Sequence, residues 1–175
     1  MGNPADRGCD VNFDPSLTDY EREIFSNVAK FGCHLTTVFD PHDHLRLFTY
    51  STGFTFSIDQ GDVIIFGLPS TVSSNVIKKL LVKCKDGLIM TDGMSVSGLL
   101  NDFDIVIKKI IPGNISIEEF NSANWFHYLK FGRPLDRAFQ LVWPDSTNGF
   151  FPWQQGCGAD VIELQPALYL EGLKH

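Results

Sequence analysis

The chain has 175 residues, of which 43% are hydrophobic and 20% charged, and its formal net charge is −7. These values are typical of one packed domain and exclude a disordered or fibrous protein. A protein built to hold phosphate backbones would carry a basic patch, so this acidic chain is expected to have no nucleic-acid partner.

The sequence lacks the features of a membrane or secreted protein. No apolar run reaches the roughly 20 residues of a membrane span, and the first residues lack the apolar core of a signal peptide. The four cysteines are scattered and form no Cys-x-x-Cys pair, which favours reduced thiols. We therefore expect a cytoplasmic protein without membrane contact. Residues 1–17 are predicted to be an irregular acidic lead-in, and residues 18–175 a single globular domain.

Capping signals predict three helices. Thr18, followed three residues later by Glu21, forms a capping box, and Gly32 can end the helix with a left-handed backbone. Ser116 and Glu119 give the same signal for the third helix. The three predicted helices cover residues 19–31, 70–86 and 116–131.

Strand signals lie between and after these helices. Residues 33–39 and 45–56 are predicted to form an antiparallel hairpin, in which Gly53 marks a bulge or a close backbone approach. Further strands are predicted at residues 62–68, 103–111 and 138–143. This order favours an α+β domain with a mainly antiparallel sheet and about three helices packed on one side.

Residues 144–163 lose all periodicity but stay rich in aromatic side chains. A structureless stretch of about 20 residues inside a domain is usually functional or disordered, and frequent Trp and Phe argue against disorder. We predict an ordered aromatic-rich C-terminal wrap whose rings fill the core. The functional alternative is that Trp143, Asp145 and Trp153 line a cleft.

Two clusters suggest chemistry, and simpler structural explanations are preferred for both. His42 and His44 lie with Asp40 and Asp43 in a predicted tight turn, and neighbouring donors on a loop tip rarely close a metal site without distant ligands, so we expect no metal. Cys33 and His34 are neighbours on a strand, where they point to opposite faces and cannot act on each other. No nucleotide-binding or hydrolase motif occurs, and no cofactor is expected.

Several segments together resemble one known family. The run Phe-Gln-Leu-Val-Trp-Pro-Asp at residues 139–145 precedes Gly-Phe-Phe-Pro-Trp at residues 149–153, and Gln-Pro follows at residues 165–166. With weaker segments upstream, this pattern is similar to the bacterial family known as domain of unknown function 4262, over about residues 31–168. The chain departs from the family pattern at Cys33 and Phe54. The resemblance implies a bacterial origin and a shared fold, and it implies no activity.

Two function hypotheses follow. The first is a non-catalytic protein-binding domain, in particular an immunity protein, or antitoxin, whose partner is a basic toxin attracted by acidic charge. Residues 1–60 hold nine acids against four bases. The predicted partner-binding residues are Asp10, Asp14, Asp19, Glu21, Glu23, Phe150, Phe151 and Trp153.

The second hypothesis is a small cytoplasmic enzyme. Its cleft would be formed by His34, Tyr50, Trp143 and Asp145, which offer groups for acid–base chemistry if they lie within hydrogen-bond reach. The missing catalytic motifs favour the first hypothesis.

Overall fold

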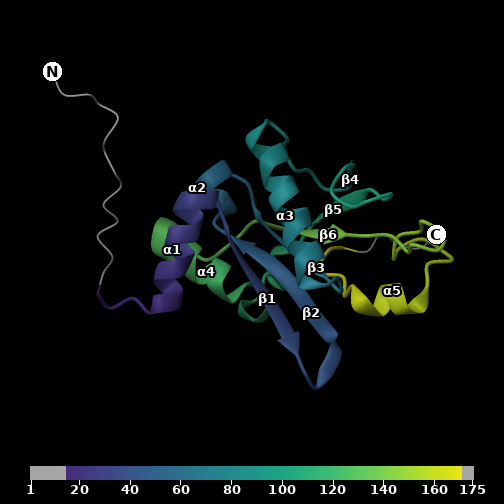
Figure 1. The fold of residues 1–175 in the computed structure, drawn as a ribbon, viewed down its shortest axis with the longest axis horizontal. Coiled ribbons are helices and arrows are strands. Elements are labelled where there is room, and N and C mark those ends of the chain that lie inside the picture. The colour runs from purple at the N-terminus through teal and green to yellow at the C-terminus, as the bar shows by residue number, and fades with distance from the viewer. Residues whose placement is uncertain (1–14, 171–175) are drawn as a thin grey trace.

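A six-stranded mixed sheet forms the centre of the protein, seen in a computed structural model that describes residues 15–170 (Figure 1). The helices are α1 (Asp19–Phe31), α2 (Phe54–Ile58), α3 (Ser70–Lys85), α4 (Ile117–Phe131) and α5 (Ala159–Leu164), with a 3-10 turn at Pro112–Asn114. The strands are β1 (His34–Asp40), β2 (Asp43–Thr52), β3 (Asp62–Phe66), β4 (Met94–Val96), β5 (Ile105–Lys109) and β6 (Ala138–Val142). The predicted lead-in lies outside the described residues except for positions 15–17.

The strand order is β1-β2-β3-β6-β5-β4. Only β3 and β6 pair in parallel, and the other neighbours are antiparallel. The predicted α+β class with a mainly antiparallel sheet is therefore confirmed.

The helices cover both faces of the sheet, so their predicted placement on one side is wrong. Val63 and Ile65 pack in one core cluster with the buried side chains of α3. Ile64 and Phe66 point the other way and pack with α4, beside which α1 lies. Because both faces of β3 are buried, its sequence is continuously apolar rather than alternating.

The capped helices form where the local signals place them. Thr18 and Glu21 form the full capping box at the start of α1, and Gly32 ends the helix with φ +92°. At α4, the Ser116 side chain accepts the backbone N–H of Glu119. These ends depend on residues close together in the sequence, which explains why they are predictable.

The predicted strand over residues 45–56 ends early, and its last part is helical. β2 stops before Gly53, which has φ +104° and precedes the short helix α2. A Cβ atom on Gly53 would lie 2.8 Å from the side chain of Val28. The predicted close backbone approach is confirmed, whereas the strand beyond it is wrong.

The cause of this break is a distant carboxylate. Asp62 is buried and accepts the N–H groups of Gly53 and Phe54 at 3.4 and 3.0 Å and the hydroxyl of Ser51 at 2.7 Å. Burial raises the pKa of Asp62 to about 6, and these hydrogen bonds oppose the rise. The turn is therefore held by a group that follows it in the chain.

The C-terminal segment is ordered, as predicted, and includes α5, which lies far from α1 and α2 (Figure 1). Its attachment depends on two buried glutamines. Gln140 donates to the carbonyl of Pro166 and accepts from the N–H of Leu168, while Gln165 pairs in the same way with both backbone groups of Trp143. Each side-chain amide donates one hydrogen bond and accepts one, as a backbone peptide group does in a sheet.

Candidate functional site

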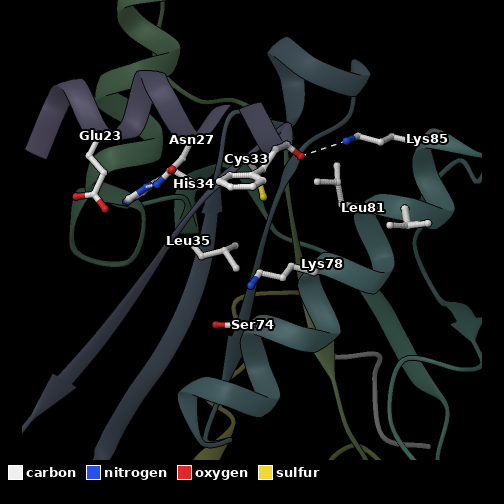
Figure 2. Close-up of a pocket in the computed structure, with 11 residues that line it drawn as sticks. Glu23, Asn27, Cys33, His34, Leu35, Ser74, Lys78, Leu81 and Lys85 are labelled. Carbon is white, nitrogen blue, oxygen red and sulfur yellow. Dashed lines mark hydrogen bonds between the residues drawn. The ribbon is translucent and has the colours of Figure 1, made fainter. Parts of the chain in front are cut away.

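A pocket of about 420 Å³ lies where α1, α3 and the start of β1 meet (Figure 2). Its lining comes from these three elements and from the residues that join α1 to β1. The lining residues are Glu23, Asn27, Phe31, Cys33, His34, Leu35, Ser74, Lys78, Leu81, Val82 and Lys85.

The floor of the pocket is the edge of the sheet. Cys33 and Leu35 pack with the α3 core cluster, while His34 points to the other face, where it meets Tyr20 of α1. Side chains of consecutive strand residues point to opposite faces, so a pocket that touches all three must lie at the strand edge. In the sheet formed by residues 15–170, β1 is an outer strand.

His34 is held in place on the α1 side. The amide Nδ2 of Asn27 lies 2.9 Å from Nδ1 of His34, and the Tyr20 ring meets the imidazole edge-on at 5.5 Å between ring centres. Burial lowers the pKa of His34, against the opposing charge of Glu23. The imidazole is therefore neutral at neutral pH and offers hydrogen bonding rather than charge.

The thiol of Cys33 is unreactive. Burial, followed by the nearby charge of Asp62, raises the pKa of its thiol to about 12, and the opposing effects of Lys85 and Lys78 are smaller. Only the thiolate is a good nucleophile, so a thiol that stays protonated at neutral pH is a poor one. Cys33 is therefore not suited to nucleophilic attack in this site.

Two lysines complete the α3 wall. Lys78 and Lys85 lie seven residues apart, which is two helical turns, and both line the pocket. Lys85 donates from Nζ to the carbonyl of Phe31 at 3.1 Å and so binds the end of α1 (Figure 2). Their spacing in the sequence places both lysines on one side of α3.

The structure does not bring the predicted cleft residues together. β1, β3 and β6 run in the same direction; His34 begins β1, whereas Asp145 follows the end of β6, so the two lie at opposite ends of the sheet. Tyr50 is 1% exposed, and its hydroxyl donates to Ser122 at 3.0 Å. A single acid–base cleft from these residues is excluded by the topology.

Asp145 and Trp143 have local structural roles. Backbone N–H groups of Thr147 and Gly158 bind the Asp145 carboxylate and hold its pKa below the usual range. Trp143 is partly buried against the α3 core cluster, and its indole N–H donates to the carbonyl of Phe66 at 2.7 Å. Both residues fix the start of the C-terminal wrap.

The predicted partner-binding acids are only partly described. Asp10 and Asp14 lie outside the described residues. Asp19 forms a 2.8 Å ion pair with Arg22, and Glu21 accepts the backbone N–H of Thr18. Glu23 is exposed and contributes to the pocket lining.

The aromatic side chains of the tail cover the outside of the sheet instead of filling the core. Phe151 and Trp153 stack at 5.1 Å between ring centres and are both partly buried, while Phe150 is 41% exposed. Nζ of Lys108 lies 5.3 Å from the centre of the Trp153 ring and of the Tyr169 ring. These contacts attach the tail to β5.

A second pocket, of about 290 Å³, is mostly acidic. It lies between the β1–β2 hairpin, the start of α4 and α5, and its charged residues are Asp43, Arg46, Glu118, Glu119 and Glu163. Within it, Arg46 and Glu118 lie 3.9 Å apart and both remain exposed. The exposed His42 and His44 lie at the hairpin. Within residues 15–170, no group of three or more His, Cys, Asp or Glu side chains is arranged to hold a metal ion.

Comparison with known proteins gives one match. A family described as "Domain of unknown function (DUF4262)" matches residues 27–158. No curated protein and no solved structure matches significantly. Among the described residues, no helix is long and apolar enough to cross a membrane.

Proposed function

Because the chain belongs to the DUF4262 family, whose description assigns no activity, we propose from the site that the protein is a non-catalytic binding domain. Its ligand is an extended peptide segment of a partner protein, and this segment lies along the outer edge of β1. The observation that carries this proposal is the position of the pocket on a sheet edge that is unpaired within residues 15–170.

The edge of β1 lacks the usual protection. The strand is seven residues long, contains no Lys or Pro, and carries an acid only at its end, Asp40. Its register is irregular only at the step from Phe39 to Asp40. Natural edge strands are usually shortened, bulged or charged to prevent pairing, so a long plain edge is suited to pairing.

The pocket lies where an added strand would lie. A paired strand lies about 4.8 Å from its neighbour, which places it beside β1 and between α1 and α3. In such complexes the main-chain hydrogen bonds supply affinity, and the flanking side chains supply specificity. Phe31, Leu35 and Val82 offer apolar surface, since Phe31 is 54% and Val82 57% exposed.

Catalysis is less well supported by the same site. The thiol of Cys33 is protonated, the imidazole of His34 is buried and neutral, and Tyr50 is enclosed. General acid–base and nucleophilic catalysis both need a reactive group within reach of a substrate.

The test begins with peptides selected from a random display library against the full chain. The backbone amides of one selected peptide are then N-methylated singly, and affinities are measured by fluorescence anisotropy. Strand pairing predicts loss of binding at every second position, because alternate amides point toward the neighbouring strand. A uniform or random pattern would contradict strand addition.

A pair of variants locates the binding surface. Val82→Glu is expected to weaken binding at least about tenfold, which corresponds to 1.4 kcal/mol. Ile162→Glu on α5, where the side chain is 44% exposed, makes the same kind of change far from the pocket and leaves affinity unchanged. Equal effects of the two changes would exclude the β1 edge as the binding surface.

Toxin neutralisation is a second candidate function, in which a basic toxin binds a different surface. The acidic second pocket is the feature that favours a basic partner. If selected peptides are basic and lose affinity in Glu163→Lys rather than in Val82→Glu, the second pocket is the binding surface and the immunity hypothesis gains support.

A further inference from the structure

The two walls of the pocket carry opposite charge. Glu23 is on the α1 wall, and Lys78 and Lys85 are on the α3 wall (Figure 2). Lys85 already binds the carbonyl of Phe31. Within residues 15–170, neither Glu23 nor Lys78 has a hydrogen bond or an ion pair, so both are available to a ligand.

Neighbouring residues of the edge experience these opposite charges. His34, on the α1 side, has its protonated form stabilised by Glu23, which acts against the effect of burial. Cys33, on the α3 side, has its ionised form disfavoured by burial and then by the charge of Asp62, while Lys85 and Lys78 oppose this with smaller effects. The charged side chains that line the pocket are therefore an acid on the α1 wall and two bases on the α3 wall.

A strand placed on this edge exposes its side chains to the two walls in turn. Successive side chains of a β-strand point to opposite faces. A side chain that faces α3 and one that faces α1 thus differ in sequence position by an odd number.

We propose, as an inference that rests on the proposed function, that the bound segment is selected by charge. It carries an acidic side chain that meets Lys78 and a basic side chain, an odd number of residues away, that meets Glu23. Exposed charges add modest affinity, but unlike pairs across an interface fix register and exclude wrong partners. This pair of contacts would set the direction and register of a segment whose main-chain hydrogen bonds alone are indifferent to sequence.

The test uses charge exchange on a selected peptide that contains one acid and one base at odd spacing. Lys78→Glu is expected to weaken binding about three- to tenfold, and changing the peptide acid to Lys restores it. Glu23→Lys is expected to weaken binding to a similar degree, and changing the peptide base to Glu restores the affinity. Binding stays weak when Lys78→Glu is combined with the changed peptide base, or Glu23→Lys with the changed peptide acid, because each wall contacts its own peptide side chain.

Lys79→Glu is the matched control. Lys79 is exposed on α3 and does not line the pocket, so this change alters the net charge equally without touching the ligand. It is expected to leave affinity unchanged at physiological salt, where the screening length is about 8 Å.

The outcomes separate this inference from the proposed function. If the period-two methylation pattern and the Val82→Glu effect are present but Lys78→Glu and Glu23→Lys change nothing, the charge selection is wrong and strand addition stands. If the methylation pattern is absent, strand addition itself is wrong. A chain that dimerises by light scattering and dissociates in Val82→Glu has a second copy on the edge, which would also overturn the inference.

Discussion

The two outer strands of the described sheet differ in how far they can pair with another chain. β4 has three residues, Met94–Val96, and offers almost no edge. β1 has seven residues and borders the pocket between α1 and α3. A short edge strand prevents pairing by its length alone, so the contrast indicates that only one side of the sheet is protected.

The largest expected difference concerns a glycine beside each edge. Gly53 has φ +104°, and a Cβ there would lie 2.8 Å from Val28, whereas Gly93, which precedes β4, has φ +80° and no atom within 4 Å of such a Cβ. Gly53→Ala combines backbone strain with overpacking and is expected to cost about 2–5 kcal/mol. Gly93→Ala has strain alone and is expected to cost about 1–2 kcal/mol.

Urea denaturation of both variants measures this difference. Equal losses would mean that α1 does not pack rigidly against the turn after β2. The β1 side of the sheet would then be as loosely supported as the β4 side.

The second prediction concerns pH, because the β1 side also contains the buried Asp62. Its pKa is about 6 in the folded protein against 3.8 ordinarily, so the folded protein binds this proton more tightly than the unfolded chain does. The contribution to stability is complete below about pH 4 and is lost as pH rises through 6. A difference of about two pKa units corresponds to roughly 3 kcal/mol.

Asp62→Asn tests this prediction, because asparagine keeps an acceptor for Ser51 and Phe54 but does not titrate. The stability of the wild type relative to this variant should fall by roughly 3 kcal/mol between pH 4 and 7, measured by denaturant unfolding. A constant difference across this range would show that the carboxyl group is not desolvated.

The smallest expected effect on stability concerns charge on each edge. Phe39 of β1 is 56% exposed, and Ser95 of β4 is exposed. Phe39→Lys and Ser95→Lys are each expected to change stability by less than about 0.5 kcal/mol. Only Phe39→Lys should raise the protein concentration at which the heated chain aggregates by light scattering, because lysine blocks pairing at an open edge. Equal aggregation of the two variants would remove the contrast between the edges.

The sequence was most informative where a structure depends on near neighbours. Thr18, Glu21 and Gly32 lie within one turn of the helix ends that they form, and α1 has its predicted bounds. Helix α2 was missed because its residues are rich in Phe and Thr, as strands are, and because Asp62 fixes its first turn from eight residues further along. A pattern read within short windows does not contain that contact.

The pocket depends on contacts that are more distant still. Leu35 and Lys78 are 43 positions apart in the sequence, and they share a cavity only because β1 is an outer strand and α3 covers one face beside it. The reversal of strand order at the parallel β3–β6 pair also separates Asp145 from His34. Residue types alone do not reveal which strand forms the edge, so the residues that line this pocket were not grouped from the sequence.

The hydrogen bonds of Gln140 also limit which mutations are tolerated at position 140. It donates to Pro166 and accepts from Leu168, so it needs one hydrogen-bond donor and one acceptor at the same position. Glutamate has nearly the same shape but no donor when ionised, and it would set an oxygen against the carbonyl of Pro166. One base change converts a glutamine codon into a glutamate codon. A single point mutation outside the C-terminal segment can therefore remove one of the two glutamine contacts that attach it.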